Sequence, residues 1–116
     1  MFVYDLTNKK SLHYLNEFHQ FHDLLNLQEG RQVPIMLVGN KKDLVDADPS
    51  LREVTEEEVQ KYVDDWEAVH IETSALTGDN VAAVFEQLIR AVRTKKYARV
   101  GGIYAKQPWY SNCDLL

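Results

Sequence analysis

The feature that most constrains the fold is an unbroken apolar run at residues 34–38, which reads PIMLV. A run of strand length without polar alternation is typical of a strand that is buried on both faces of a parallel sheet. Its proline stands first, where the missing backbone donor disturbs a strand least. Shorter β-prone segments at residues 2–6 and 69–73 supply further strands. The sequence therefore predicts a parallel sheet in which residues 34–38 are covered on both sides.

Three amphipathic segments separate or follow these strands. The first is expected to begin at Ser11 and to end at Gly30. Its apolar face recurs at steps of three and four: Leu12, Leu15, Phe18, His22 and Leu25. The second begins with a capping box, Thr55 and Glu58, and the third is expected to be capped by Asn80. The apolar face of the third consists of Val81, Val84, Phe85, Leu88, Ile89 and Val92.

Alternation of strands and helices predicts an α/β fold, a three-layer parallel sheet with flanking helices. Hydrophobic residues make up 45% and charged residues 27% of the 116 residues, which is the composition of a folded protein. We expect this domain to occupy residues 1–97, with irregular segments at residues 45–53 and 74–79. Residues 98–116 have no periodicity and are expected to form a flexible basic tail.

Two polar loops follow the second and third predicted strands, GNKKDL at residues 39–44 and ETSAL at residues 72–76. Ligands of parallel sheets bind at this carboxyl edge. An aspartate there can accept two parallel hydrogen bonds from guanine, whose ring N–H and exocyclic amine lie on one edge. Asparagine, lysine and aspartate after a strand are also ordinary turn residues, so the tetrapeptide NKKD alone leaves both interpretations open.

Three segments resemble the second half of a Ras-like small GTPase: residues 3–5 with Asn8 and Ser11, residues 34–43, and residues 72–75. The resemblance runs from about residue 2 to residue 93. It implies a P-loop small GTPase fold and GTP or GDP as the ligand. It also assigns recognition of the guanine base to Asn40, Lys41, Asp43, Ser74, Ala75 and Leu76. Leu76 stands where many members of that family carry lysine.

The family motifs for phosphate binding and catalysis do not occur in these 116 residues. No glycine of the five fits G-x-x-x-x-G-K-[S/T], and none is preceded by an aspartate three residues earlier. We therefore expect a truncated GTPase domain without catalytic residues or Mg²⁺ ligands of its own. Such a chain should bind guanine nucleotide weakly, because the phosphate contacts that dominate affinity are missing.

The charge distribution is uneven along the chain. Residues 1–89 carry 7 basic and 17 acidic side chains, whereas residues 90–112 carry six basic and no acidic ones. An acidic body repels phosphates, so no nucleic-acid partner is expected. A basic tail suits an anionic membrane surface.

The C-terminal sequence CDLL fits the C-a-a-X pattern, in which Cys113 would be prenylated. A terminal leucine favours geranylgeranyl over farnesyl, and the basic residues upstream supply the second signal that a single lipid needs. This pattern predicts that the chain is anchored at the cytoplasmic face of a membrane, and we expect that membrane to be the plasma membrane. A free cysteine near a frayed end is the alternative.

Two further clusters could hold metals. His19 and His22 lie three residues apart on the first predicted helix, with His13 nearby, but helical histidine pairs without a third strong ligand are usually packed or solvated. Asp43, Asp46 and Asp48 lack the glycine and closing glutamate of a calcium loop. No metal site is expected at either.

Two hypotheses for the function follow. The first is a membrane-anchored guanine-nucleotide signalling switch of the small GTPase class, here truncated, with protein regulators or effectors as partners. The alternative is a non-enzymatic, prenylated, membrane-anchored interaction module that keeps the base-side half and binds a partner through its uncovered sheet.

Overall fold

The computed structural model describes the backbone of residues 1–29 and 33–100 and the side chains of residues 1–28 and 33–94. Gly30, Cys113 and the tail beyond residue 100 therefore lie outside the described residues. The elements in chain order are β1 (Phe2–Asp5), α1 (Lys9–Glu29), β2 (Met36–Asn40), α2 (Lys42–Ala47), the 3₁₀ turn η1 (Pro49–Leu51), α3 (Glu56–Trp66), β3 (Val69–Glu72) and α4 (Val81–Val100). In this part of the chain, no helix combines the length and apolar character that crossing a membrane requires.

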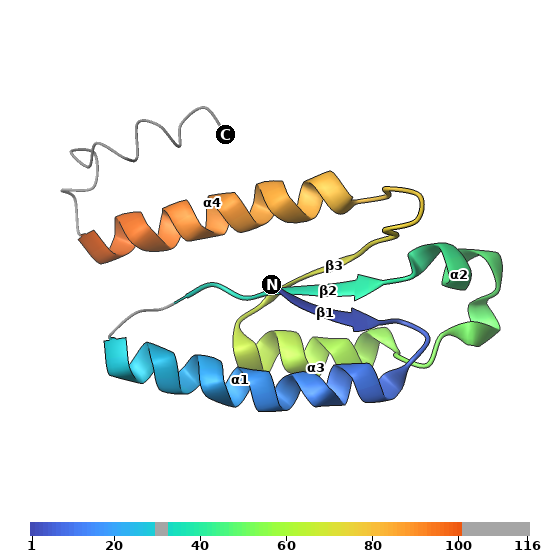
Figure 1. Ribbon diagram of the computed structural model, residues 1–116, viewed down its shortest axis with the longest axis horizontal. Coiled ribbons are helices and arrows are strands. Elements are labelled where there is room, and N and C mark those ends of the chain that lie inside the picture. The colour runs from blue at the N-terminus through green and yellow to red at the C-terminus, as the bar shows by residue number, and fades with distance from the viewer. Residues whose placement is uncertain (30–32, 101–116) are drawn as a thin grey trace.

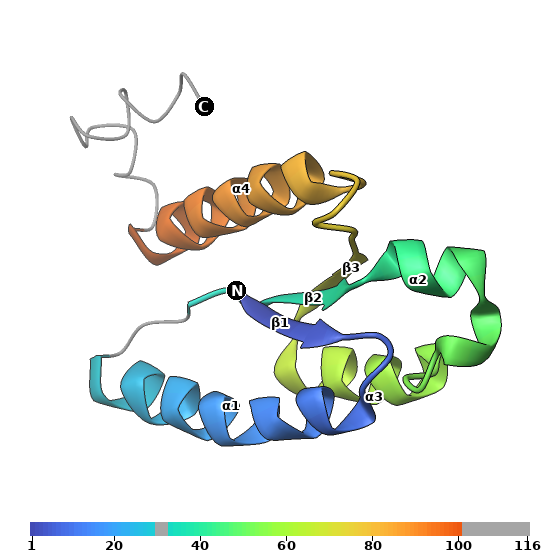
Figure 2. The ribbon, with the colours of Figure 1, turned by 45° about the vertical axis from the view of Figure 1, so that its right-hand side comes forward.

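The three strands form one parallel sheet in the order β1-β2-β3. Figures 1 and 2 show α1 and α3 beneath one face of this sheet and α4 alone across the other. This arrangement confirms the expected three-layer α/β fold. The register pairs Asp5 with Asn40 and Gly39 with Glu72, so the carboxyl ends of all three strands lie at one edge.

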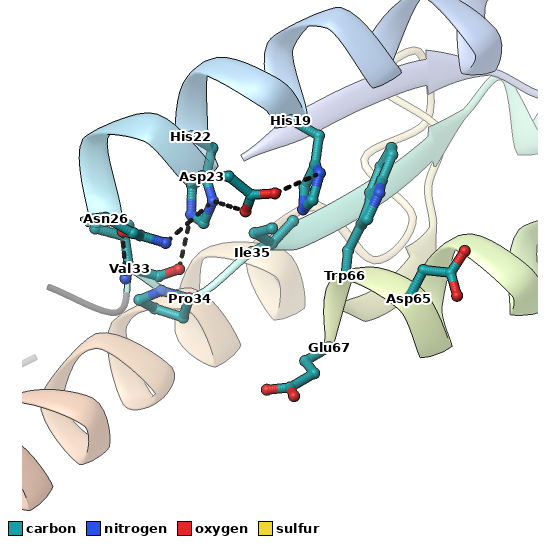
Figure 3. A pocket seen from close by; sticks show the side chains of 10 residues that line it. All are labelled: His19, His22, Asp23, Asn26, Val33, Pro34, Ile35, Asp65, Trp66 and Glu67. Carbon is teal, nitrogen blue, oxygen red and sulfur yellow. Dashed lines mark hydrogen bonds and ion pairs between the residues drawn. The ribbon is translucent and has the colours of Figure 1, made fainter. Parts of the chain in front are cut away.

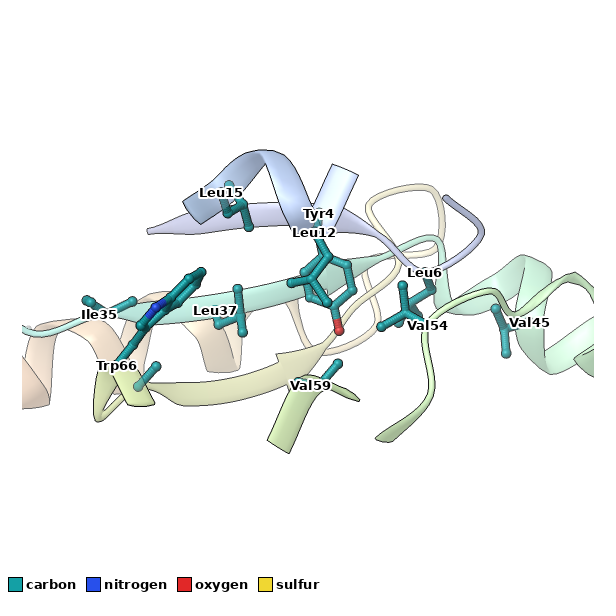
Figure 4. Packing of buried hydrophobic residues seen from close by; sticks show 11 residues of the cluster. Tyr4, Leu6, Leu12, Leu15, Ile35, Leu37, Val45, Val54, Val59 and Trp66 are labelled. Atoms are coloured by element: carbon teal, nitrogen blue, oxygen red, sulfur yellow. The ribbon is translucent and has the colours of Figure 1, made fainter. Parts of the chain in front are cut away.

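The central strand β2 is buried on both faces, as its apolar run predicts. Leu37 is fully buried in the larger cluster, which lies between the sheet and the helices α1 and α3 (Figure 4). Met36 and Val38 point to the opposite face and pack with Val84 of α4. The absence of polar alternation in residues 34–38 is therefore the direct consequence of two apolar layers.

A glycine in β2 lets a tyrosine ring pass close to the strand. A Cβ atom built on Gly39 would lie 2.7 Å from the Tyr4 hydroxyl and 2.9 Å from a methyl group of Leu6. The Tyr4 hydroxyl continues to Nε2 of His70 on β3 at 2.7 Å. Gly39 thus allows a buried hydrogen bond that spans the width of the sheet.

The predicted apolar face of α1 is wrong at Phe18 and Leu25, whereas the half-buried His22 does lie on the inward side. Leu12 and Leu15 are buried, but Phe18 and Leu25 are each 56% exposed. The inward side of the helix carries His19 instead, whose ring stacks on Trp66 of α3 at 4.6 Å between centroids. Because apolar residues lie all around this helix, a period of three and four fits more than one face. Large apolar side chains left exposed on α1 are Tyr14, Phe18, Phe21, Leu24, Leu25 and Leu27.

The first helix is capped by Asn8 and not by Ser11. Asn8 Oδ1 accepts a hydrogen bond from the Lys10 amide at 3.1 Å, two positions into the helix. Ser11 Oγ instead accepts one from the Asp5 amide at 2.8 Å, which fastens the first turn of α1 to the end of β1. Two polar residues at a helix start compete for the cap, and the backbone turn decides between them.

The other predicted caps have mixed outcomes. Thr55 caps α3 as predicted, since its Oγ1 accepts from the Glu58 amide at 3.2 Å. The Glu58 carboxylate pairs with Lys9 at 2.6 Å. Asn80 precedes α4 as predicted, but it has a φ of 60° and its amide donates to the Glu72 carbonyl at 2.9 Å.

The segment after β2 is helical, where the sequence predicts an irregular loop. Helix α2 begins at Lys42 and buries Val45 on its inner side. An ion pair of Lys42 and Asp46, four residues apart, supports the single turn. At the other end of the chain α4 extends to Val100, three residues beyond the expected domain boundary.

One partly buried ion pair supports the outer strand β3. Arg52 binds Glu72 through both of its terminal nitrogens, at 2.8 and 3.0 Å. The hydrogen bond from Arg52 holds the pKa of the Glu72 carboxyl below its ordinary value. Because two parallel bonds fix the guanidinium, this pair is stronger than a single surface contact.

Leu37→Ala should lower the free energy of unfolding by about 3 kcal/mol, because it removes a fully buried side chain from the core. Urea unfolding followed by circular dichroism measures the change. Leu27→Ala is the matched control, since Leu27 is 80% exposed and its truncation should cost less than about 0.5 kcal/mol. Equal costs at the two positions would contradict the described packing.

Glu72→Gln should destabilise the fold at neutral pH by about 1 kcal/mol, because it removes the charge that Arg52 binds. The pKa of Glu72 is lowered in the folded state, so its stabilisation is complete above the ordinary value of 4.5 and is lost as the pH falls further. Urea unfolding across pH should thus show a constant difference from the parent chain at pH 6 to 7 that shrinks in acid. Glu17→Gln, at an exposed position of α1, is the matched control and should change the free energy of unfolding by less than about 0.5 kcal/mol at neutral pH.

Candidate nucleotide-base site

The loops that follow β2 and β3 are joined by backbone hydrogen bonds. The Thr73 amide donates to the Gly39 carbonyl at 2.8 Å, and the Lys42 amide donates to the Thr73 carbonyl at 2.9 Å. These bonds continue the pairing of the two strands beyond the sheet. The two polar loops predicted to meet at the carboxyl edge therefore do meet.

Asn40, at the end of β2, binds the second loop through its side chain. Its Oδ1 accepts from the Ala75 amide at 3.0 Å and from the Thr73 hydroxyl at 3.4 Å. Its amide nitrogen has no partner among residues 1–28 and 33–94, so the donor of this side chain remains available to a ligand. The N7 atom of a purine is a hydrogen-bond acceptor that this amide could bind.

Asp43 lies in the first turn of α2 and binds the same loop. Its Oδ1 accepts from the Ser74 hydroxyl at 2.8 Å, and Ser74 is almost fully buried. The Ser74 oxygen in turn accepts from the Thr77 amide at 3.1 Å. Oδ2 of Asp43 accepts no bond from the described side chains, so the carboxylate is fixed in place and still has lone pairs to offer.

Lys41 connects the site to the first strand. Its backbone is left-handed, with a φ of 69°, a conformation that is costly for a residue with a side chain and is found most often at functional turns. Its Nζ lies 2.8 Å from Oδ2 of Asp5. Burial raises the pKa of Asp5, but the hydrogen bonds from Lys41 and Thr7 outweigh it, so the pKa lies below its usual value. The pair keeps both charges and positions the lysine stem.

Lys42 joins α2 to the loop before α4. Its Nζ lies 2.8 Å from carboxylate oxygens of both Asp46 and Asp79. Hydrogen bonds to these carboxylates raise the pKa of Lys42. We call the two loops at this edge, residues 39–44 and 73–79, the base loops. The two ion pairs of Lys42 fix the distance between them.

The last two predicted residues lie on the surface of the second loop. Ala75 is exposed, and its amide is engaged by Asn40. The Leu76 side chain is 84% exposed, and its amide donates to no group of the described chain. The Leu76 amide is thus the remaining backbone donor for a carbonyl such as guanine O6.

The arrangement gathers Asn40, Lys41, Asp43, Ser74, Ala75 and Leu76 at one edge of the sheet, as the sequence predicts. Sequence reasoning missed Asp5 and Lys42 as supporting residues. The position of Asp5 could have been inferred from parallel pairing, which sets it beside Asn40. The donors and acceptors fit a guanine base: two carboxylate oxygens for its N–H groups, an amide donor for N7 and a backbone N–H for O6.

Comparisons with known proteins show the family of the chain. The family model described as Ras family matches residues 1–94. The chain is 38% identical over 95 residues to "Ras-related protein O-RAL" of Diplobatis ommata, covering 81% of this chain and 43% of that protein. It is 35% identical over 94 residues to "Ras-related protein Ral-a" of Drosophila melanogaster, with 81% and 44% covered.

A third relative is "Ras-related protein ralB-B" of Xenopus laevis, 36% identical over 97 residues, with 83% of this chain and 44% of that protein covered. The chain therefore spans less than half of the length of these curated relatives. The match covers all three strands and the whole base edge. On this match, the chain belongs to the Ras family of small GTPases.

Proposed function

We propose that this chain is the guanine-recognising part of a Ras family nucleotide switch, with Asn40, Lys41 and Asp43 on one loop and residues 74–76 on the other. The observation that carries the proposal is the pair of cross-links between the loops, from Asn40 to Ala75 and from Asp43 to Ser74. Because these bonds fix Asn40 and Asp43 against the second loop, less conformational entropy is lost when the loops order around a base.

The chain alone should bind guanine nucleotides weakly and should not hydrolyse GTP. Each base contact contributes roughly 1–3 kcal/mol, whereas association costs about 4–15 kcal/mol. The phosphate-loop and D-x-x-G motifs that would supply phosphate and Mg²⁺ contacts do not occur in the sequence. Regulators and effectors are proposed as protein partners of the complete switch.

Asp43→Asn should reverse the base preference. The carboxylate accepts from both N–H groups of guanine, whereas an asparagine amide offers one donor and one acceptor, which suits the C2 carbonyl and N1–H of xanthine. Saturation-transfer NMR with GMP, XMP and AMP measures the preference at the weak affinities expected here. The variant should lose about tenfold or more of its GMP signal relative to XMP.

Asp64→Asn is the matched control for this change, since Asp64 lies on α3, away from both loops, and its side chain accepts a hydrogen bond from Gln60. It should leave the preference for GMP unchanged. Equal saturation of GMP and AMP by the parent chain would contradict recognition of guanine. Binding of GDP at micromolar concentration or below would contradict the proposed loss of affinity.

A second candidate function is the prenylated interaction module. The observation that favours it is the exposed apolar surface on α1, which includes Tyr14, Phe18 and Phe21. If the folded chain transfers no saturation to GMP, XMP or AMP in the same NMR experiment, the result would support the interaction module over base recognition.

We propose further that Cys113 carries a prenyl group and that the basic tail adds attraction to an anionic membrane. The C-terminal CDLL and the acid-free basic stretch at residues 90–112 support the proposal. The cytoplasmic face of the plasma membrane is the proposed location.

Cys113→Ser should move the full chain from the membrane fraction to the supernatant in cells, because it removes the only thiol that a prenyl group can modify. Fractionation with immunoblotting measures the shift. Ser111→Ala is the matched control, since it changes the same tail and leaves the final four residues intact. Unchanged membrane association of Cys113→Ser would refute the lipid anchor.

A further inference from the structure

The C-terminal half of α1 carries a cluster of metal-ligating side chains far from the base loops. His19, His22 and Asp23 face the start of β2, at the end of the strand opposite Asn40. They border a solvent-open cavity of about 220 Å³, which also touches Pro34, Ile35 and Trp66. Figure 3 shows the Asp23 carboxylate between the two imidazole rings.

We propose that His19, His22 and Asp23 form a binding site for a zinc-like divalent transition metal. The Nδ1 atom of His19 lies 3.5 Å from Asp23 Oδ2, and Nδ1 of His22 lies 3.8 Å from Asp23 Oδ1. One ligand atom from each of the three residues can be chosen so that all lie within 4.8 Å of one another. In tetrahedral zinc sites with bonds of about 2.0–2.1 Å, ligand atoms are roughly 3.3–3.5 Å apart, so small side-chain rotations suffice.

The tautomer of His22 is already the one that such a site needs. Its Nε2 lies 2.9 Å from the Val33 carbonyl, which can only accept, so Nε2 carries the proton. The lone pair is therefore on Nδ1, where the Asn26 amide donates at 3.3 Å. A metal ion at Nδ1 would replace the hydrogen bond from Asn26. The hydrogen bond to the Val33 carbonyl would still orient the ring, as hydrogen bonds to the second ring nitrogen do in zinc-bound histidines.

His19 is held in place by packing. Its ring stacks on Trp66 at 4.6 Å and on His22 at 5.8 Å, with interplanar angles of 11° and 20°. Burial lowers the pKa of His19, although Asp23 acts in the opposite direction. The two stacking contacts thus fix the orientation of the ring beside Asp23.

The chemistry of the three groups favours zinc over magnesium or calcium. Two imidazole nitrogens and one carboxylate suit Zn²⁺, Co²⁺, Ni²⁺ or Cu²⁺, whereas Mg²⁺ and Ca²⁺ require mainly oxygen ligands. Asp65 and Glu67 line the same cavity, but Figure 3 shows both carboxylates directed away from the cluster. Water is therefore the proposed fourth ligand. The sequence predicts no metal at this histidine pair, because the pair has no evident third strong ligand, and Asp23 is the residue that we propose in that place.

Calorimetric titration of the full chain with Zn²⁺ tests the site, in a background that carries Cys113→Ser and Trp109→Phe. The first change removes a competing thiol, and the second leaves Trp66 as the single tryptophan. We expect one Zn²⁺ per chain at micromolar concentration. Co²⁺, used as a spectroscopic probe, should show tetrahedral absorption bands and quench the Trp66 emission, because it binds beside the stacked His19 ring.

Asp23→Asn should weaken Zn²⁺ binding at least about tenfold, and His19→Ala should do the same. Asp23 is the safer variant, since its side chain is 58% exposed and its loss should not affect folding. His13→Ala is the matched control, because it removes a histidine from the same helix two turns away and should leave binding unchanged. Absent binding, unchanged binding in Asp23→Asn, or equal weakening by His13→Ala would overturn the proposal.

Discussion

The structure depends on β2, which is paired with a strand on each side and packed by helices on each face. No position of Met36–Gly39 can be polar without leaving a buried group unsatisfied. The strand also positions the candidate site, because the loop at its carboxyl end is bonded to the loop that follows β3. The sheet and the base loops are therefore directly connected. Gly39 leaves room for Tyr4 to pack, and the next residue, Asn40, accepts a hydrogen bond from Ala75 of the second base loop.

Much of the fold could be predicted from the sequence because burial on two faces leaves an unmistakable apolar run. The buried side of α1 could not be predicted, because that helix carries apolar residues around most of its surface. The residue on which His19 stacks, Trp66, lies 47 positions further along the chain. Helix α2 was equally hidden. Its single turn depends on Val45 reaching the core and on the pair of Lys42 and Asp46, neither of which has a periodic signal.

The candidate site was predicted residue by residue, but its support was not. Asn40, Asp43 and Ser74 are recognisable because their order along the chain matches a known family pattern. Asp5 stands in a segment that resembles the family, but the resemblance assigns it no role, and Asp79 stands outside the resembling segments. Both residues act through strand register and loop closure. Asp5 pairs with Lys41 and Asp79 pairs with Lys42, which reduces the repulsion between the two neighbouring cations. These pairs also stabilise the turn in which Lys41 has a left-handed backbone.

The two proposed sites lie at opposite ends of β2, and the sheet accounts for both positions. At the carboxyl end, backbone hydrogen bonds that continue the strand pairing join the two loops. At the opposite end, α1 crosses the segment that enters β2, so the Val33 carbonyl meets His22 and selects its tautomer. A change at Asp23 should therefore leave base recognition intact, and a change at Asp43 should leave metal binding intact, because β2 separates the two sites and neither shares a side chain with the other.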